Sequence, residues 1–214
     1  IVNADALQVF DNWRVLTARP DAVDEGVAVH KLYGHVGKHT PYSVGHWLRD
    51  VAELLKGHDR LIIVGGTGLY FRALSEGLSD IPPIPTAIRE QADLMRRNGQ
   101  LDQMIADLTQ DTTKTIDLQN PMRVQRAWEV QKTTGKSLAA WHAATPAPLL
   151  GLEKVTPLVI DAPKDWLSPR IAQRFDLMID QGALEEVAQN APDWDADLPS
   201  SKAIGAPELM AYVQ

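Results

Sequence analysis

The sequence predicts an α/β fold in which a sheet of parallel strands is interrupted by an inserted all-helical domain. The main observation is the stretch at residues 61–71, LIIVGGTGLYF, where four aliphatic residues lead into a glycine-rich turn and a helix. The order helix, strand, glycine turn, helix around this stretch is typical of parallel sheets. Residues 83–150, in contrast, show helical periodicity and no convincing strand.

The composition narrows the class of protein. With 214 residues, 44% of them hydrophobic and 23% charged, the chain is long enough for a substantial core, and it holds no apolar run of membrane-spanning length. The absence of cysteine excludes disulfides and thiolate metal sites and suits the cytoplasm. The net charge of -7 argues against broad nonspecific binding of nucleic acid but allows a local basic face. Because it starts at Ile1 without Met and stays helical in pattern from Leu209 to Gln214, we expect the sequence to be trimmed at both ends.

The first residues predict the end of a strand followed by a polar turn. Ile1 and Val2 are aliphatic, and Asp5 follows closely behind them. Asp5 can be a turn cap or a chemically active carboxylate, and the sequence leaves both interpretations open. Four histidines between residues 30 and 46 do not form an H-E-x-x-H pattern, so a histidine metal site is not favoured.

The central stretch predicts a fully buried strand at residues 61–64 and a helix from about Leu69. A helix stopped by Gly57, for which Ser43 is the expected N-cap, leads into this strand. In open α/β sheets the point just beyond the carboxyl end of a strand is where ligands bind. Thr67 is the one side chain of the glycine turn that can hydrogen-bond a ligand, although the glycines can equally form a plain connector.

A proline-rich connector at residues 81–85 leads into the helical region. Two amphipathic segments lie on either side of Asn98 and Gly99, and Asn120 followed by a proline predicts a helix start. Gly135 ends that helix. On it, Arg123 and Arg126 fit either a solvated face or a phosphate contact, and Arg89 is equally ambiguous.

The C-terminal part predicts a return to the sheet. Residues 156–161 are expected to form a strand, and Pro169 to begin a long helix. That helix should turn the following residues to the core: Ile171, Phe175, Met178, Ile179, Leu184 and Val187. Arg170 and Arg174 lie four residues apart near the expected helix start, which favours an anion such as phosphate, although ion pairs with Asp176 or Asp180 explain them as well.

Five motifs, in this order over nearly the whole chain, resemble those of the tRNA dimethylallyltransferases. Each is weak alone, whereas the order and spacing are specific. The motifs are DALQ at residues 5–8 with TARP at 17–20; VGGTGLY at 64–70; NPMRVQRA at 120–127 with TGK at 134–136; RIAQRF at 170–175; and LPS at 198–200 with KAIG at 202–205.

This resemblance implies a P-loop NTPase-like core formed by residues 1–82 and 151–214, with a helical insertion at residues 83–150 that contacts tRNA. It also implies transfer of a dimethylallyl group from dimethylallyl diphosphate, with Mg²⁺ on the diphosphate, to N6 of the adenine following the anticodon. Asp5 would be the base, Thr67 a contact beside the reacting centre, and Arg174, with Arg170, the diphosphate ligands. The implied contacts to the tRNA anticodon arm are Asp5, Ala6, Leu7, Gln8, Thr67, Arg89, Met122, Arg123, Val124, Gln125, Arg126, Lys202, Ala203, Ile204, Gly205, Ala206 and Pro207.

The chain departs from the family pattern at three places. The family's glycine-rich phosphate loop is expected upstream of Ile1, Met122 replaces a common glutamine, and Ala206 and Pro207 replace an aromatic and basic pair. A monomeric cytoplasmic enzyme is expected. Two alternatives remain at this point: a P-loop kinase-like phosphotransferase for a small molecule, and a non-catalytic RNA-binding relative.

Overall fold

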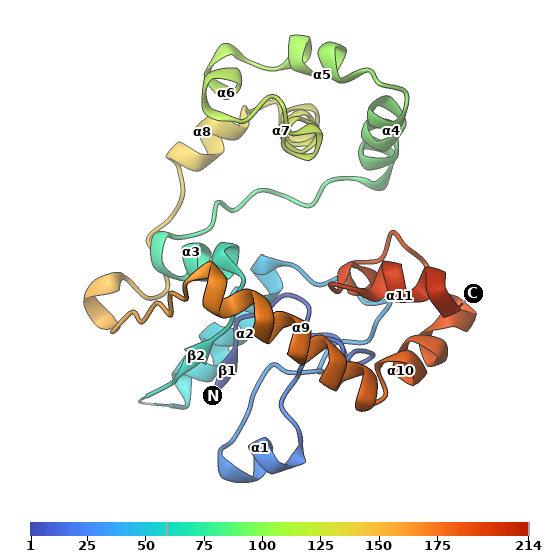
Figure 1. The fold of residues 1–214 in the computed structure, drawn as a ribbon. Coiled ribbons are helices and arrows are strands. Elements are labelled where there is room, and N and C mark those ends of the chain that lie inside the picture. Colours follow the sequence, from blue (N-terminus) through green and yellow to red (C-terminus); the bar gives the residue numbers. More distant parts are fainter. Residues whose placement is uncertain (59, 214) are drawn as a thin grey trace. The chain divides into compact units, whose positions relative to one another are not determined.

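The structure is a computed structural model that describes residues 1–58 and 60–213. It divides into two compact units (Figure 1): unit 1 comprises residues 1–75 and 149–214, and unit 2 comprises residues 76–148. None of the helices in the described part of the chain is long and apolar enough to cross a membrane.

Unit 1 is the α/β part of the chain. Its small sheet has two strands, β1 (Val2–Asn3) and β2 (Ile63–Val64), which pair in parallel with Val2 opposite Ile63. The parallel arrangement agrees with the sequence-based expectation of an α/β fold. The helices of unit 1 are α1 (Ala22–Val27), α2 (Val44–Lys56), α3 (Gly68–Glu76, which ends in unit 2), α9 (Lys164–Asp180), α10 (Ala183–Asn190) and α11 (Ala206–Val213).

The core of unit 1 next to the sheet is built from α2 and α3. Val2 is fully buried and packs with Trp47 of α2 and Tyr70 of α3. The rings of Trp47 and Tyr70 stack with centroids 4.5 Å apart. A second cluster joins Trp13 to Val187 of α10. The chain that follows β1 is therefore packed at Ala4 against the first cluster and at Trp13 against α10.

Every helix of unit 2 belongs to the stretch for which the sequence predicts no strand. They are α4 (Thr86–Arg97), α5 (Leu101–Asp107), α6 (Gln110–Thr115), α7 (Pro121–Thr134) and α8 (Leu138–Ala143). The helix start at Asn120 is confirmed, because its side chain accepts hydrogen bonds from the amides of Met122 and Arg123. Gly135 ends α7 in the left-handed conformation, as glycine does most readily. The core of unit 2 forms around Val124 and Trp128 of α7.

The predicted strand at residues 61–64 is shorter and less buried than expected. Only Ile63 and Val64 form β2, while Ile62 is 62% exposed and Val64 49% exposed. Among the described residues β2 pairs with β1 alone, so an aliphatic run that would suit a central strand remains partly open to solvent.

The strand predicted at residues 156–161 is wrong. This segment has no regular secondary structure, and its side chains at Leu158, Val159 and Ile160 are 87–96% exposed. An apolar run becomes a strand only when a neighbouring strand takes up its backbone hydrogen bonds, and no described strand pairs with this segment.

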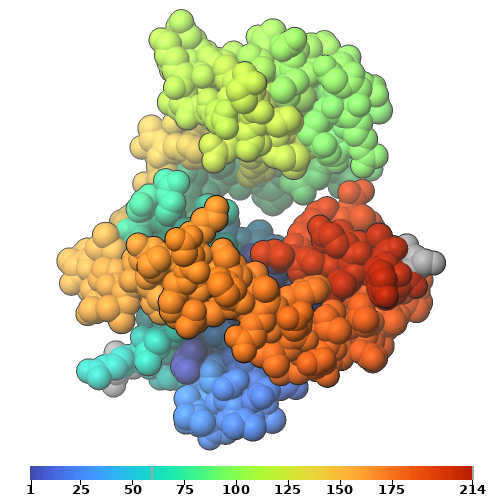
Figure 2. Space-filling view, viewed as in Figure 1, coloured from blue at the N-terminus to red at the C-terminus, as the bar shows by residue number. Residues whose placement is uncertain are grey.

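The long helix predicted from Pro169 also differs from the structure. It begins at Lys164 and holds Pro169 inside, and Gly182, with φ of 96°, separates it from α10. The prolyl ring in the second turn therefore did not mark the helix start. Helix α9 has no buried residue, so Ile171 and Phe175, which were expected in the core, are exposed, and α9 lies on the surface of unit 1 (Figure 2).

Smaller predictions fared differently. Ser43 is the N-cap residue of α2 and Gly57 its C-cap, but the Ser43 hydroxyl pairs with His46 Nδ1 instead of capping a backbone amide. Helix α11 covers Leu209 to Val213, which confirms the helical pattern there. Gln214 lies outside the described residues.

Candidate functional site

The ends of β1 and β2 meet because Gly65 has no side chain. A Cβ at Gly65 would lie 2.2 Å from the carbonyl carbon and oxygen of Ala4, so the two backbones could not approach as they do. The contact is held by the Thr67 amide, which donates to Ala4 O at 3.2 Å. The glycine turn is thus more than a connector, because it brings the segment around Thr67 against the turn that follows β1.

Asp5 and Thr67 lie side by side at this junction. The Thr67 Oγ1 accepts a 2.9 Å hydrogen bond from the amide of Ala6, the residue after Asp5. The Thr67 hydroxyl proton is donated to none of the described residues. The hydroxyl therefore has one donor position left for a ligand.

The Asp5 carboxylate combines the two roles that the sequence left open. Its Oδ1 accepts hydrogen bonds from the amides of Leu7 at 2.8 Å and Gln8 at 3.3 Å, which is the turn-capping role. Its Oδ2 accepts no hydrogen bond from a described residue. Asp5 is half-buried, so one oxygen fixes the side chain and the other is available to accept a proton.

Asn3 is a site residue that the sequence analysis missed. It is fully buried, its Nδ2 donates to the carbonyls of Asp5 at 2.9 Å and Leu32 at 3.0 Å, and its Oδ1 accepts from the Asp5 amide. Trp47 Nε1 donates to the Asn3 carbonyl at 2.6 Å. In the sequence, Asn3 is a polar residue at the end of an aliphatic strand. The simpler expectation for such a residue is a solvent-exposed side chain, so Asn3 was not recognised.

Two tyrosines sense the Asp5 charge and were also missed as site residues. Burial, and then the charge of Asp5, raise the pKa of Tyr70 to about 12. Burial and the Asp5 charge raise the pKa of Tyr33 in the same order. The shared cause shows that both phenols lie within reach of the Asp5 charge. Tyr70 stood inside the 61–71 stretch, whereas Tyr33 lies in a loop without a motif.

The remaining residues of the 5–8 motif hold the turn together. Gln8 Nε2 donates to the carbonyls of Thr17 at 2.9 Å and Ala18 at 3.1 Å, which ties the first motif to the 17–20 segment. Ala6 and Leu7 are half-buried and pack in separate hydrophobic clusters. Their backbone amides, more than their side chains, contribute to the site.

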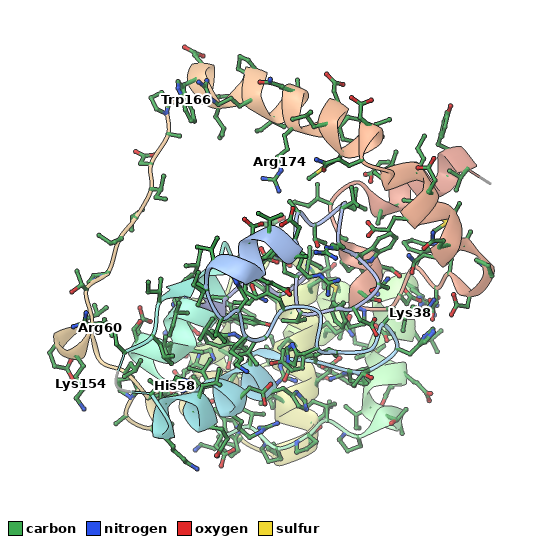
Figure 3. All side chains as sticks on the ribbon, turned by 90° about the horizontal axis from the view of Figure 1, so that it is seen from below. Lys38, His58, Arg60, Lys154, Trp166 and Arg174 are labelled. Atoms are coloured by element: carbon green, nitrogen blue, oxygen red, sulfur yellow. The ribbon has the colours of Figure 1, made fainter. Side chains whose placement is uncertain are left out.

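The two arginines of α9 differ in what surrounds them. The Arg170 guanidinium lies 3.6 Å from the centroid of the Trp166 ring and donates to the Trp166 carbonyl at 3.0 Å. Arg174 is exposed, its guanidinium has no hydrogen bond or ion pair with a described residue, and it extends from α9 toward the rest of unit 1 (Figure 3). Because α9 begins at Lys164, neither arginine lies in the first helical turn, and the expected help from the helix N-terminus is wrong.

In unit 2, the residues of α7 that are predicted to contact RNA are partly exposed and partly buried. Met122, Arg123 and Arg126 are exposed, whereas Val124 and Gln125 are buried. The side chains of Val124 and Gln125 thus belong to the interior of unit 2, and their predicted contact with tRNA stays a prediction. Val124 packs in the core, and Gln125 accepts from Arg96 and donates to Asp93 and Glu129.

Arg89 and Arg126 lie close enough for their charges to interact. Although the Arg126 side chain reaches solvent, partial burial of its guanidinium is the main cause that lowers its pKa; the charge of Arg89 lowers it further, while Glu129 opposes both effects. The Arg126 guanidinium is 3.9 Å from the Glu129 carboxylate. Arg89 and Arg123 are exposed and pair with none of the described residues. Three arginines on α4 and α7 thus form a basic face of unit 2.

The segment at residues 202–207 is similarly mixed. The side chains of Ala203 and Ala206 are buried against Leu16 and Trp13, and the predicted contact of these residues with RNA stays a prediction. Lys202 donates to the carbonyl of Ala196. Gly205 has φ of 86°, a conformation that favours glycine. Ile204, 87% exposed, and Pro207 remain at the surface.

The structure therefore brings together Asp5, Ala6, Gln8 and Thr67. It shows no contact of Arg170 or Arg174 with these residues. No group of three or more His, Asp or Glu side chains in the described parts of the chain could hold a metal ion, so the protein residues do not form a Mg²⁺ site of that kind.

Comparison with known proteins adds the family context. The family model for IPP transferase matches residues 8–214. A protein of Dinoroseobacter shibae named tRNA dimethylallyltransferase is 58% identical, with an alignment that covers all of this chain and 73% of that protein. A protein of the same name from Cereibacter sphaeroides is 54% identical over all of this chain and 68% of its own length.

Solved structures agree at the level of the fold. A tRNA isopentenylpyrophosphate transferase from Bacillus halodurans has a TM-score of 0.60 and 24% identity, over 99% of this chain and 68% of that protein. A eukaryotic dimethylallyltransferase acting on tRNA has a TM-score of 0.79 and 18% identity, over 99% of this chain and 56% of the other.

Proposed function

The chain belongs to the tRNA dimethylallyltransferase family, and from this premise we propose that it transfers a dimethylallyl group from dimethylallyl diphosphate to tRNA. The acceptor is N6 of the adenine that follows the anticodon. One observation carries the proposal: Asp5 presents a carboxylate oxygen without a partner among the described residues, next to Ala6, whose amide binds the Thr67 hydroxyl. The two alternatives, a small-molecule phosphotransferase and a non-catalytic RNA-binding protein, are not favoured by similarity to enzymes named for this transfer over the whole chain.

The chemical step assigns a role to each group. The exocyclic amine is a poor nucleophile because its lone pair is delocalised into the purine ring. Asp5 Oδ2 takes the amine proton as the bond from nitrogen to the dimethylallyl carbon forms, and the Thr67 hydroxyl donates a hydrogen bond to the nucleoside. The bond from carbon to oxygen breaks, and its electron pair leaves with the diphosphate.

Charge grows on the leaving diphosphate, and Arg174 is the residue proposed to stabilise it. A guanidinium offers forked donors that match phosphate oxygens, and Arg174 has no partner among the described residues that would compete. Arg170 is a weaker candidate because its guanidinium already lies on Trp166. Mg²⁺ bound with the diphosphate would supply further positive charge to the leaving group.

RNA binding is proposed for unit 2 and for the surface of residues 202–207. We assign the anticodon arm to the exposed groups Arg89, Met122, Arg123 and Arg126, together with Lys202, Ile204 and Pro207. The P-loop-type core at residues 1–82 and 151–214, and the role of residues 83–150 as its tRNA-binding insertion, are parts of the same proposal. So are the cytoplasmic location and the monomeric state.

The test is direct. The protein is incubated with dimethylallyl diphosphate, Mg²⁺ and unmodified tRNA that carries adenine after the anticodon, and the RNA is digested and analysed by mass spectrometry. We expect N6-isopentenyladenosine at that single position. Failure to form it with intact protein would reject the proposed transfer.

Replacing the base tests the mechanism within the same assay. Asp5→Asn keeps an oxygen that can cap Leu7 and Gln8 but removes the proton acceptor, so the single-turnover rate should fall by about 100-fold or more. Asp111→Asn, at an exposed position of α6, is the control and should retain the full rate. An unchanged rate in Asp5→Asn would mean that the proton goes elsewhere, for example to the diphosphate.

A further inference from the structure

Tyr33 is fixed beside Asp5 by hydrogen bonds on both sides of it in the chain. On one side, Asn3 Nδ2 bridges the carbonyls of Leu32 and Asp5. On the other, the amide of Gly34 donates to the carbonyl of Gln8 at 2.8 Å. The loop that carries Tyr33 is therefore tied at two points to the turn that carries the proposed base.

The backbone around Tyr33 is unusual and held in place. Leu32 has φ of 63° and Gly34 has φ of 52°, so two left-handed residues flank the tyrosine. For a leucine this conformation is costly and persists only where surrounding contacts enforce it. At Gly34 a Cβ would lie 1.3 Å from Nη1 of Arg19, so the arginine side chain covers the loop at that point.

The ring of Tyr33 differs from that of Tyr70, the other tyrosine near Asp5. Tyr70 is 3% exposed and stacks on Trp47, so its ring is part of the core. Tyr33 is half-buried, and its aromatic neighbour is His30, edge to face at 5.5 Å. The Tyr33 ring therefore keeps part of its surface open to a ligand, which the Tyr70 ring does not.

We propose that Tyr33 stacks on the acceptor adenine and holds its N6 amine against Asp5, an inference that rests on the proposed transfer. An adenine must leave its own stack to reach a reacting centre, and aromatic side chains replace the lost stacking. Tyr33 is the half-buried aromatic residue that the two backbone ties place beside the base. It acts through the face of its ring, so the hydroxyl is dispensable.

Three substitutions separate stacking from other roles. Tyr33→Phe keeps the ring and should bind tRNA and transfer within about threefold of the wild type. Tyr33→Leu removes the ring and should weaken tRNA binding by about 5- to 150-fold, the equivalent of one base stacked on an aromatic ring. Tyr33→Trp should retain binding. Tyr212→Leu, at a tyrosine 76% exposed on α11, is the matched control and should behave as the wild type.

A fluorescent probe reads stacking without any turnover. The anticodon-arm RNA carries 2-aminopurine in place of the acceptor adenine, and its emission is measured in the saturated complex. We expect quenched emission with wild type, Tyr33→Phe and Tyr33→Trp, and brighter emission with Tyr33→Leu. Equal emission and equal affinity for wild type and Tyr33→Leu would overturn the proposal, as would a loss in Tyr33→Phe equal to that in Tyr33→Leu.

The probe also distinguishes this inference from the proposed function. If wild type forms no isopentenyladenosine but its 2-aminopurine complex is quenched through Tyr33, the transfer fails and the stacking stands. If transfer occurs and the emission does not depend on Tyr33, the stacking fails alone. Circular dichroism of each variant checks the fold, and if Tyr33→Leu does not fold, unquenched emission in the wild-type complex would still overturn the stacking.

Discussion

At the scale of single residues, the site depends on how many partners each polar atom already has. Asp5 uses one oxygen for the turn, and its other oxygen has no partner in the part of the chain that the structure describes. Thr67 accepts from Ala6 and keeps its proton available. The same comparison separates the two arginines of α9, since Arg170 packs on Trp166 and Arg174 does not.

The arginine difference predicts unequal losses of activity. Arg174→Ala should lower the single-turnover rate by about 100-fold or more, because it removes charge stabilisation of the departing diphosphate. Arg170→Ala should cost clearly less and should instead free Trp166, whose fluorescence would change. Rapid-quench kinetics at saturating tRNA measures the single-turnover rate of both variants. Equal losses of rate would contradict the assignment of separate roles.

Part of this site could be predicted from the sequence and part could not. Asp5 and Thr67 each follow an aliphatic strand, and because parallel strands end at the same edge, their proximity follows from the pattern. The position of Tyr33 could not be predicted because it depends on a left-handed Leu32 and on two long-range hydrogen bonds, from Asn3 to Leu32 and from Gly34 to Gln8. Neither leaves a periodic trace in the sequence.

At the scale of elements, helix α10 supports the turn that follows the site. The Glu186 carboxylate accepts hydrogen bonds from three consecutive backbone amides, those of Arg14, Val15 and Leu16, at 2.6 to 3.0 Å. Asn190, one helical turn later, exchanges hydrogen bonds with Asn12. The turn that provides Thr17 and Ala18 to Gln8 is thereby anchored to α10.

Loss of this anchor should be measurable as stability. Glu186→Gln should lower the free energy of unfolding by about 1 to 3 kcal/mol, because an amide has one acceptor oxygen for three backbone donors. Glu185→Gln, at the exposed neighbour on the same helix, is the control and should change little. Urea denaturation measures the free energy of unfolding of both variants. An unchanged value for Glu186→Gln would show that water replaces the carboxylate as the acceptor.

In unit 2 a carboxylate joins two helices and should confer acid sensitivity. Asp107 at the end of α5 accepts from Trp128 Nε1 at 2.9 Å and pairs with Lys132 at 3.0 Å, both on α7. The bond from Trp128, followed by that from Lys132, lowers the pKa of Asp107 below its ordinary value of 3.8. At pH values above 3.8 the ionised carboxylate therefore contributes its full stabilisation to the folded state.

The stabilisation should be lost as pH falls through the lowered pKa, since protons then bind the folded carboxylate and break the pairing. In Asp107→Asn the melting temperature should be lower than in the wild type at neutral pH, and the gap should narrow below about pH 4. Asp176→Asn, at an exposed position of α9, is the control. A gap that stayed constant to acid pH would contradict the role of the charge.

The accuracy of the predicted elements depended on whether their signals were local. Asn120, Pro121 and Gly135 bound α7 as predicted because caps act within one helical turn. The 156–161 strand failed because a strand requires a partner far away in the sequence. Pro169 misled because it lies within α9, whose first turn forms ahead of it.

At the scale of the whole molecule, a net charge of -7 coexists with a basic face on unit 2. Arg89, Arg123 and Arg126 are exposed on α4 and α7. Because phosphate contacts are local, the sign of the total charge does not decide whether RNA binds.

This basic face predicts a salt-dependent binding defect. Arg123→Ala should weaken the binding of anticodon-arm RNA and lower the slope of log K against log salt by about 0.7 to 0.9, the value for one phosphate contact. Lys114→Ala, at an exposed lysine of α6, is the control within the same unit. Filter binding at several salt concentrations measures the slope. A slope for Arg123→Ala equal to that of the wild type would exclude a phosphate contact.

The buried Gln125 has a practical consequence for attempts to change which tRNAs the enzyme accepts. Its amide is hydrogen-bonded to Asp93, Arg96 and Glu129, so every change there disturbs three partners on two helices. A randomised library over residues 122–126 should therefore return wild-type residues at positions 124 and 125 and diversity at 122, 123 and 126. If α7 contacts tRNA as proposed, the positions that can be varied without disturbing the core are those three.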